Sequence, residues 1–250
     1  MVPPPAPNVF RDLKELVDRV PIITRYLVFS TLAFSVGATL SLIDVRKLVL
    51  DFYPMYTKLE IWRFFTPHLL SGGQGLLFHL MFLYQQSLEL ESSHFGGRKA
   101  DYCFNILIIM ALLNVVGVYM TLPVLTSAFG MALTYLYANV KGDQIVSFMF
   151  GFQFKAMYLP WVLLLMNVLM SGDFMMPVLG IAVGHVVYYL DVLYPLSHNN
   201  QRLLPTPGFI QTWFPQPVGV HGMGGAVPGA AAPTQTTRNA WGSGHRLGSS

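Results

Sequence analysis

The chain has 250 residues, of which 53% are hydrophobic and only 11% are charged. Soluble domains average about 25% charged residues, so this composition excludes a soluble globular protein and indicates an integral membrane protein. The net charge is +3, but the basic residues are scattered along the chain, which excludes a nucleic-acid-binding protein. The single cysteine, Cys103, lies in an apolar run, so no disulfide can form within the chain.

Residues 1–21 form the first predicted segment, which we place in the cytosol. The segment has no apolar core after a basic start, so we expect no cleavable signal peptide. Its apolar side chains recur on one face of a helix, which predicts a short amphipathic helix. This helix either lies on the membrane surface or packs on loops of its own protein. The apolar face consists of Phe10, Leu13, Leu16, Val17 and Val20.

Residues 22–195 form the predicted membrane domain, an all-α bundle of six transmembrane helices. A spanning helix needs about 20 apolar residues, and six stretches approach or exceed that length. Pro123 separates the third from the fourth with almost no loop, which predicts an antiparallel hairpin. The six stretches are 22–43, 74–91, 102–122, 123–140, 157–172 and 175–194.

The distribution of Lys and Arg predicts the orientation of these helices. Eleven of the fifteen basic residues fall in segments that alternate crossings place on one side of the membrane. The loop after the first helix holds the other four, Arg46, Lys47, Lys58 and Arg63. The positive-inside rule therefore places both termini in the cytosol and this loop on the luminal side.

The first loop, residues 44–73, is long for a compact membrane domain, and such loops are usually functional or disordered. It is rich in aromatic residues, so we expect it to lie partly in the outer leaflet. Within it, Trp62 suits headgroup depth, and Arg63 can reach lipid phosphates or backbone carbonyls. An ordinary interface anchor is the alternative interpretation of this dipeptide.

The last candidate helix carries two glycines four residues apart, Gly180 and Gly184, followed directly by His185. This spacing lets two helix backbones approach closely, so we expect tight packing on the fourth candidate helix. An ionisable residue at membrane depth raises a catalytic hypothesis for His185. A structural hydrogen bond across helices is the alternative, and it is the interpretation we favour for a lone histidine.

Residues 196–250 form a tail with six prolines among many glycines, which predicts a disordered cytosolic extension. Its end reads WGSGHRLG, residues 241–248. Trp241 and Leu247 are large apolar residues in a segment that buries nothing else, which is typical of a docking peptide. Gly242 and Gly244 would let the backbone lie close against a partner.

Together these features resemble the rhomboid superfamily: six helices, an aromatic first loop with Trp62-Arg63, and the paired glycines of the sixth helix. The stretches HFGGRKADY (94–102) and GIAVGH (180–185) are similar to the Derlin branch of that superfamily, and the resemblance covers about residues 10–200. The terminal motif resembles the SHP box, which in Derlins binds the AAA ATPase valosin-containing protein. The residues that would carry this binding are Trp241, Gly242, Gly244, Arg246, Leu247 and Gly248.

The resemblance also implies that protease chemistry is missing. Active rhomboids use a serine in Gly-x-Ser-Gly near the start of the fourth helix and a histidine three residues before the first glycine of the sixth-helix pair. This chain lacks that motif, has Thr126 and Ser127 in the region, and has Pro177 at the histidine position. His185 lies eight positions further on, about 12 Å along the helix and out of reach of the same nucleophile. We expect no catalytic residue, no metal and no cofactor.

The resemblance implies a protein of the endoplasmic reticulum membrane that acts in the degradation of misfolded proteins. Derlins help misfolded luminal or membrane proteins to cross to the cytosol for ubiquitin- and proteasome-dependent degradation. The implied partners are an AAA ATPase of the valosin-containing type, a Hrd-type membrane ubiquitin ligase complex, the misfolded substrates, the lipid bilayer and further copies of the chain.

Two physical features suit this role. Helices 123–140 and 157–172 would span about 24 to 27 Å, less than the ~30 Å hydrocarbon core, so they would thin the bilayer. The second helix carries polar residues late in its course, and Gln85 and Gln86 among them predict a polar groove open to the cytosol. Alternatively, this helix ends near Gln85 and the acidic residues after it lie beyond the bilayer.

The sequence is also compatible with three other functions. A membrane adaptor would recruit the ATPase without moving substrate. An intramembrane protease would need unusual catalytic residues, such as Ser127 or His185. A transporter or channel would predict an inverted internal repeat, which we do not find in the sequence.

Overall fold

The structure is a computed structural model, which describes residues 14–15, 17–72, 75–147, 151–198, 203 and 205–214. Within these ranges, the longer helices correspond one to one with the six predicted apolar stretches. They are α2 (Ile22–Thr39), α5 (Gly75–Glu89), α6 (Lys99–Tyr119), α7 (Thr126–Lys141), α8 (Leu159–Ser171) and α9 (Met175–Tyr188).

Shorter elements connect these helices. In the first loop they are η1 (Val45–Lys47), α3 (Phe52–Thr57), η2 (Ile61–Phe64) and α4 (Thr66–Leu69). Two π-helical turns extend α5 and α9, namely η3 (Leu90–His94) and η6 (Tyr189–Leu193). The remaining elements are the antiparallel pair β1 (Ile145–Ser147) and β2 (Gln153–Lys155), and the short helices η5 (Ala156–Tyr158), α10 (Tyr194–Ser197) and α11 (Gly208–Trp213).

Three helical stretches in the described part of the chain are long and apolar enough to cross a membrane. They are Ile22–Thr39, Lys99–Tyr119 and Met175–Ser197. The stretch Ala156–Ser171 is apolar but shorter. The crossing of the membrane by all six helices, and the cytosolic position of both termini, therefore stay predictions.

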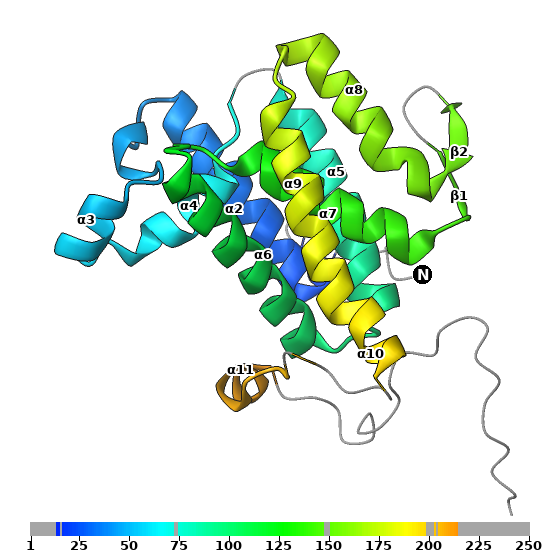
Figure 1. Ribbon diagram of the computed structural model, residues 1–250. Helices are drawn as coiled ribbons and strands as arrows, with labels where there is room; N and C mark the ends of the chain where they lie inside the picture. The colour runs from blue at the N-terminus through cyan, green and yellow to red at the C-terminus, as the bar shows by residue number, and fades with distance from the viewer. Residues whose placement is uncertain are drawn as a thin grey trace, which may run out of the picture.

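Helix α7 lies at the centre of the bundle (Figure 1). Ten of its sixteen residues are buried, and Phe129, Leu133 and Leu136 are completely inaccessible. Helix α9 packs along α7, and α5 also contacts it. Because α7 is short and enclosed, its neighbours supply the surface that faces the surroundings.

Helix α8 lies at the edge of the bundle (Figure 1), and most of its apolar side chains are exposed or half-buried. Only Leu159 and Pro160, at its first turn, are buried. In a membrane, exposed apolar residues such as Leu169 and Met170 contact lipid. The hydrophobicity of α8 therefore suits solvation by the bilayer more than packing within the protein.

The start of the tail differs from the prediction of disorder from residue 196 onward. Residues 205–214 include α11, which contacts α6. Ile210 is only 1% exposed, and Thr206 donates a hydrogen bond to Asp101 at 2.6 Å. The Pro and Gly content of the tail therefore did not predict α11, in which the apolar side chain of Ile210 is buried.

Candidate functional site

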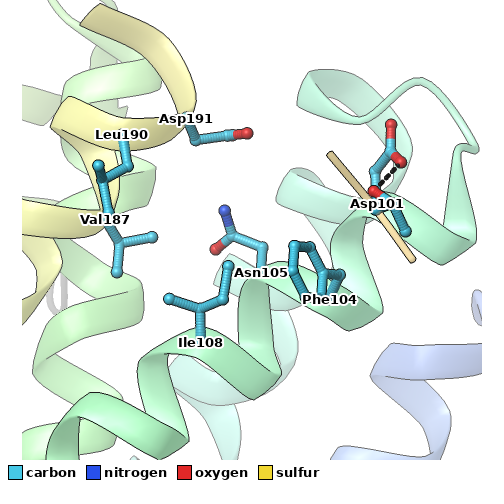
Figure 2. Close-up of a pocket in the computed structure, with 8 residues that line it drawn as sticks. Asp101, Phe104, Asn105, Ile108, Val187, Leu190 and Asp191 are labelled. Carbon is cyan, nitrogen blue, oxygen red and sulfur yellow. Dashed lines mark hydrogen bonds between the residues drawn. The ribbon is translucent and has the colours of Figure 1, made fainter. Parts of the chain in front are cut away.

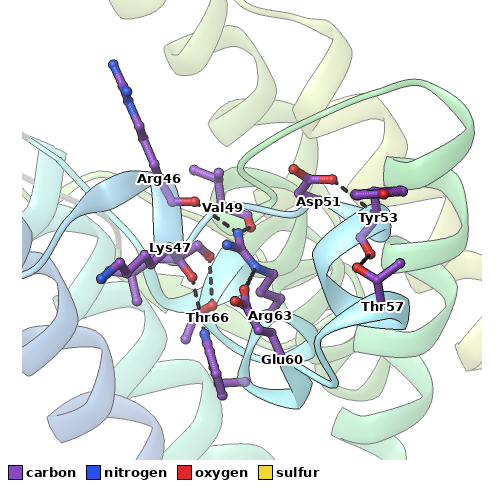
Figure 3. A network of polar contacts seen from close by, with 11 residues as sticks. Arg46, Lys47, Val49, Asp51, Tyr53, Thr57, Glu60, Arg63 and Thr66 are labelled. Carbon is purple, nitrogen blue, oxygen red and sulfur yellow. Dashed lines mark hydrogen bonds and ion pairs between the residues drawn. The ribbon is translucent and has the colours of Figure 1, made fainter.

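The guanidinium of Arg63 is the centre of a polar network within the first loop (Figure 3). Its Nη1 donates to the carbonyl oxygens of Arg46, at 2.9 Å, and Val49, at 2.8 Å. Its Nε forms an ion pair with Glu60 at 2.5 Å. The side chain is buried, so Arg63 binds backbone carbonyls, one of the two roles that its sequence suggested.

Trp62 and Thr66 donate hydrogen bonds to the two backbone carbonyls that lie between those bound by Arg63. The indole Nε1 of Trp62 donates to Lys47 at 3.3 Å, and the Thr66 hydroxyl donates to Leu48 at 2.7 Å. Four consecutive carbonyls, those of residues 46–49, therefore accept bonds from side chains of residues 62–66. Backbone groups at membrane depth must be satisfied within the protein, so this network suits a loop that lies partly in lipid.

The same loop is fastened to the helices beneath it. The Asn114 amide of α6 donates to the carbonyl of Phe64 at 2.9 Å. The Thr126 hydroxyl lies close to two carbonyls of the loop, that of Leu70 at 2.7 Å and that of Pro67 at 3.1 Å. The loop is therefore a fixed part of the bundle at the end where α7 begins.

Helices α7 and α9 are in backbone contact at the two glycines. A Cβ on Gly180 would lie 2.3 Å from the carbonyl oxygen of Ala128 and 2.7 Å from the Cβ of Met131. A Cβ on Gly184 would lie 2.9 Å from the carbonyl oxygen of Ala132. Only glycine fits at both positions, and the pair sets the distance between the two helices.

Pro177, Thr126 and Ser127 are the residues that the resemblance to rhomboids sets at or near the catalytic positions, an assignment that stays a prediction. Pro177 is buried in the first turn of α9 and has no ionisable side chain. The hydroxyl of Thr126 is bound to loop carbonyls. His185 lies further along α9, where its Nδ1 is 2.8 Å from the Tyr135 hydroxyl of α7 and the two rings meet edge to face. His185 thus bridges two helices.

The polar residues late in α5 do not form one shared face. Gln85 is exposed, whereas Gln86 is buried and accepts a hydrogen bond from the Thr134 hydroxyl of α7 at 3.0 Å. The Gln86 Nε2 has no partner among the described residues. The structure therefore does not bring the two predicted groove residues together.

Glu91, just beyond α5, fixes the start of α2. Its carboxylate is buried and accepts bonds from the backbone N–H groups of Ile23, at 3.2 Å, and Thr24, at 2.8 Å. A negative charge at a helix N-terminus satisfies its free N–H groups and complements the helix dipole. Helix α5 continues past Gln85 to Glu89, so the prediction that it ends near Gln85 was wrong. The depth of Glu91 in the bilayer and its place beside a groove stay predictions.

Sequence reasoning also missed His68, which is completely buried in α4. Its ring meets Phe129 of α7 edge to face, with centroids 5.7 Å apart. Burial lowers the pKa of His68 to about 4, so the imidazole is neutral in the folded protein. A single histidine in an aromatic loop gave no periodic signal that could have revealed its burial.

Comparison with known proteins identifies the family. A sequence model described as the Der1-like family matches residues 20–208, which is most of the chain. The chain belongs to the Der1-like family. Its match spans the Trp62-Arg63 network, the α7–α9 contact and the polar end of α5, and it confirms the resemblance to the Derlin branch.

Individual relatives of this Der1-like chain are similar over most of their length. Derlin-1 of Homo sapiens is 35% identical over 251 residues, which cover 95% of this chain and 98% of that protein. Derlin-1 of Drosophila melanogaster is 32% identical, covering 92% and 96%. A probable derlin-2 homolog of Dictyostelium discoideum is 34% identical, covering 80% and 82%.

The predicted ATPase-binding motif lies outside the described residues. This concerns Trp241, Gly242, Gly244, Arg246, Leu247 and Gly248. The role of this motif in ATPase binding stays a prediction.

Proposed function

We propose that this Der1-like chain is a catalytically inactive, rhomboid-like protein of the endoplasmic reticulum membrane. In this proposal it assists the retrotranslocation of misfolded proteins to the cytosol for ubiquitin- and proteasome-dependent degradation. The observation that carries it is Pro177, a residue without a proton to exchange, at the position of the catalytic histidine. The close contact of Gly180 with α7, next to Pro177 on α9, supports a rhomboid-like arrangement of these two helices.

The short lengths of α7 and α8 support a role in easing passage across the membrane, with the exposed α8 as the helix in contact with lipid and α7 enclosed behind it. With 16 and 13 residues, they would span about 24 and 20 Å, less than the ~30 Å hydrocarbon core. A short lipid-facing helix is accommodated by local thinning of the bilayer. Thinner lipid beside α8 lowers the barrier for a polar segment to cross.

A polar path beside α5 is the second part of this proposal. Exposed Gln85 offers a polar contact on the outer face of α5. The Gln86 Nε2 is a donor that no described residue uses. A crossing polypeptide would contact the exposed Gln85, and would reach the buried Gln86 only where α5 moves away from α7.

The proposed partners follow from the family and the tail. Residues 241–248 would bind an AAA ATPase of the valosin-containing type, which supplies the pulling force. The membrane domain would associate with a Hrd-type ubiquitin ligase complex, with misfolded substrates, and with further copies of the chain.

A membrane adaptor is the second candidate function, and the docking pattern of Trp241 and Leu247 favours it. An adaptor recruits the ATPase but contributes no path for the substrate. Deleting residues 240–250 separates the two roles, because the deletion leaves every described residue of the membrane domain in place.

The test compares the intact chain, the deletion and a Gln85→Ala/Gln86→Ala double variant in cells. Pull-downs in mild detergent would measure ligase and ATPase association, and pulse-chase would measure degradation of a misfolded reporter. We expect the deletion to lose the ATPase but keep the ligase, and the double variant to slow degradation while keeping both. Unchanged degradation in the double variant would favour the adaptor. Loss of reporter cleavage in Ser127→Ala or His185→Ala would instead show a protease.

A further inference from the structure

A small cavity lies between the first turns of α6 and the π-helical end of α9 (Figure 2). Its volume is about 20 Å³, enough for one group of the size of a water molecule. Its polar lining consists of Asp101 and Asn105 of α6, Asp191 of η6, and Thr206. The other wall consists of apolar side chains from α6 and α9.

Asn105 provides an unused hydrogen-bond acceptor in this cavity. The residue is only 4% exposed, and its Oδ1 has no partner among the described residues. Buried polar atoms are nearly always hydrogen-bonded in folded proteins, so an unpaired one indicates a missing partner. That partner must be a donor, because the free atom is a carbonyl-type oxygen.

Asp191 adds a carboxylate to the same space. Figure 2 shows its side chain directed from the end of α9 into the gap above Asn105. It belongs to η6, and π-helical turns within α-helices are frequent at functional sites. Its Oδ2 lies 3.5 Å from the His94 Nε2, a contact that is an ion pair only when His94 is protonated.

The opposite side of the cavity is closed by the start of the tail. Asp101 is paired with Arg98 at 2.9 Å and accepts a hydrogen bond from Thr206 at 2.6 Å. This arrangement holds residue 206 against α6. A ligand therefore reaches the cavity more easily along the seam between α6 and α9 than past the tail.

The lining selects a cationic donor over a metal ion. Calcium takes six to eight oxygen ligands and magnesium needs near-octahedral geometry, which a cavity with one apolar wall does not supply. An ammonium group is water-sized, carries donors only, and tolerates an apolar wall beside its hydrocarbon. The cavity also lies near the ends of two stretches that are long and apolar enough to cross a membrane, where we expect lipid headgroups.

We propose that this cavity binds the primary ammonium group of phosphatidylethanolamine, with Asn105 and Asp191 as its acceptors. The ammonium donates to the Asn105 Oδ1, which Figure 2 shows on the side of Val187, and pairs with the Asp191 carboxylate across the cavity. The lipid chains would lie along the α6–α9 seam, where half-buried Ile108 and buried Val187 line the wall. This inference does not depend on the proposed role in degradation.

The test uses the full-length chain in mild detergent with lipids of identical acyl chains. Native mass spectrometry would measure retention of phosphatidylethanolamine and phosphatidylcholine, whose trimethylated nitrogen has no N–H donor. We expect phosphatidylethanolamine to be retained about tenfold more strongly, in line with charge-assisted hydrogen bonds. Asp191→Asn and Asn105→Leu should each remove most of this preference.

Asp143→Asn is the matched control, because it makes the same charge change at an exposed carboxylate paired with Lys155. It should leave the headgroup preference unchanged. Equal retention of the two lipids by the unmodified chain would overturn the proposal even if Asn105→Leu fails to fold. So would thermal stabilisation by calcium or magnesium that Asp191→Asn abolishes, or displacement of the lipid by a lysine-rich peptide, which would identify a polypeptide as the ligand.

Discussion

Four adjacent backbone carbonyls in the first loop depend on three side chains, and two of the four depend on Arg63 alone. A planar guanidinium can reach two carbonyls and a carboxylate at once. The arginine therefore holds the loop together from within. Its neighbour Trp62 is half exposed and donates one bond back to the same turn.

Arg63→Lys should destabilise the protein by about 1 to 3 kcal/mol, because one ammonium cannot replace the three contacts and leaves buried carbonyls unpaired. Thermal unfolding in detergent and limited proteolysis of the loop would measure the effect. Arg46→Lys is the control, since the Arg46 side chain points away from the network in Figure 3. Equal effects of the two substitutions would contradict the role assigned to Arg63.

His68 should make the stability of the protein depend on pH. Its pKa is about 4 when folded and near 6.5 when unfolded, so the unfolded chain binds a proton first as the pH falls. Stability is fully present above pH 6.5 and is lost toward pH 4, by up to about 1.4 kcal/mol per pH unit.

Unfolding temperatures measured between pH 7 and pH 5 would test this, with His68→Leu expected to show a shallower decline. His198→Leu, at an exposed histidine, should keep the slope of the unmodified chain. Parallel pH profiles for the unmodified chain and His68→Leu would show that His68 is not responsible.

Among the described glycines, Gly180 has the closest contact with another helix, and this contact joins α9 to α7. Gly180 lies against the α7 backbone itself, so no side chain can move aside to admit a methyl group. The same contact places His185 within hydrogen-bonding distance of Tyr135. Helix spacing and the bridging histidine therefore depend on one another.

Gly180→Ala should destabilise the bundle by about 1 to 3 kcal/mol, the usual range for overpacking a well-packed site. Gly184→Ala should cost less, because its nearest contacts start at 2.9 Å rather than 2.3 Å. Gly75→Ala, which meets nothing within 4 Å, is the control. Thermal unfolding of the three variants would rank them, and a neutral Gly180→Ala would contradict the backbone contact.

In the whole molecule, the positions of the six longer helices could be predicted from the sequence better than the contacts between them. Apolar runs and small-residue spacing are local signals, so the six helices and the glycine pair could be read directly. The bond from Thr24 to Glu91 joins residues 67 positions apart, and no local pattern marks such a partner. The burial of Ile210 could not be predicted for the same reason, because the residues that cover it belong to other elements.

The mixture of long and short helices should make stability depend on bilayer thickness. Helices α2 and α6 match an ordinary bilayer, whereas α7 and α8 are several residues shorter. We expect unfolding temperatures to be highest in bilayers of short-chain lipids and to fall as the acyl chains lengthen. A steady rise in stability with chain length, measured in reconstituted vesicles, would contradict a thinned membrane.

The peripheral position of α8 has a consequence for the order in which parts of the protein open. Local unfolding costs least where few apolar contacts are buried, and α8 buries only Leu159 and Pro160. Because α7 is enclosed by other helices as well, we expect α8 to open locally at a lower free-energy cost than the central helices. Hydrogen exchange should then be fastest in α8 and slowest in α7.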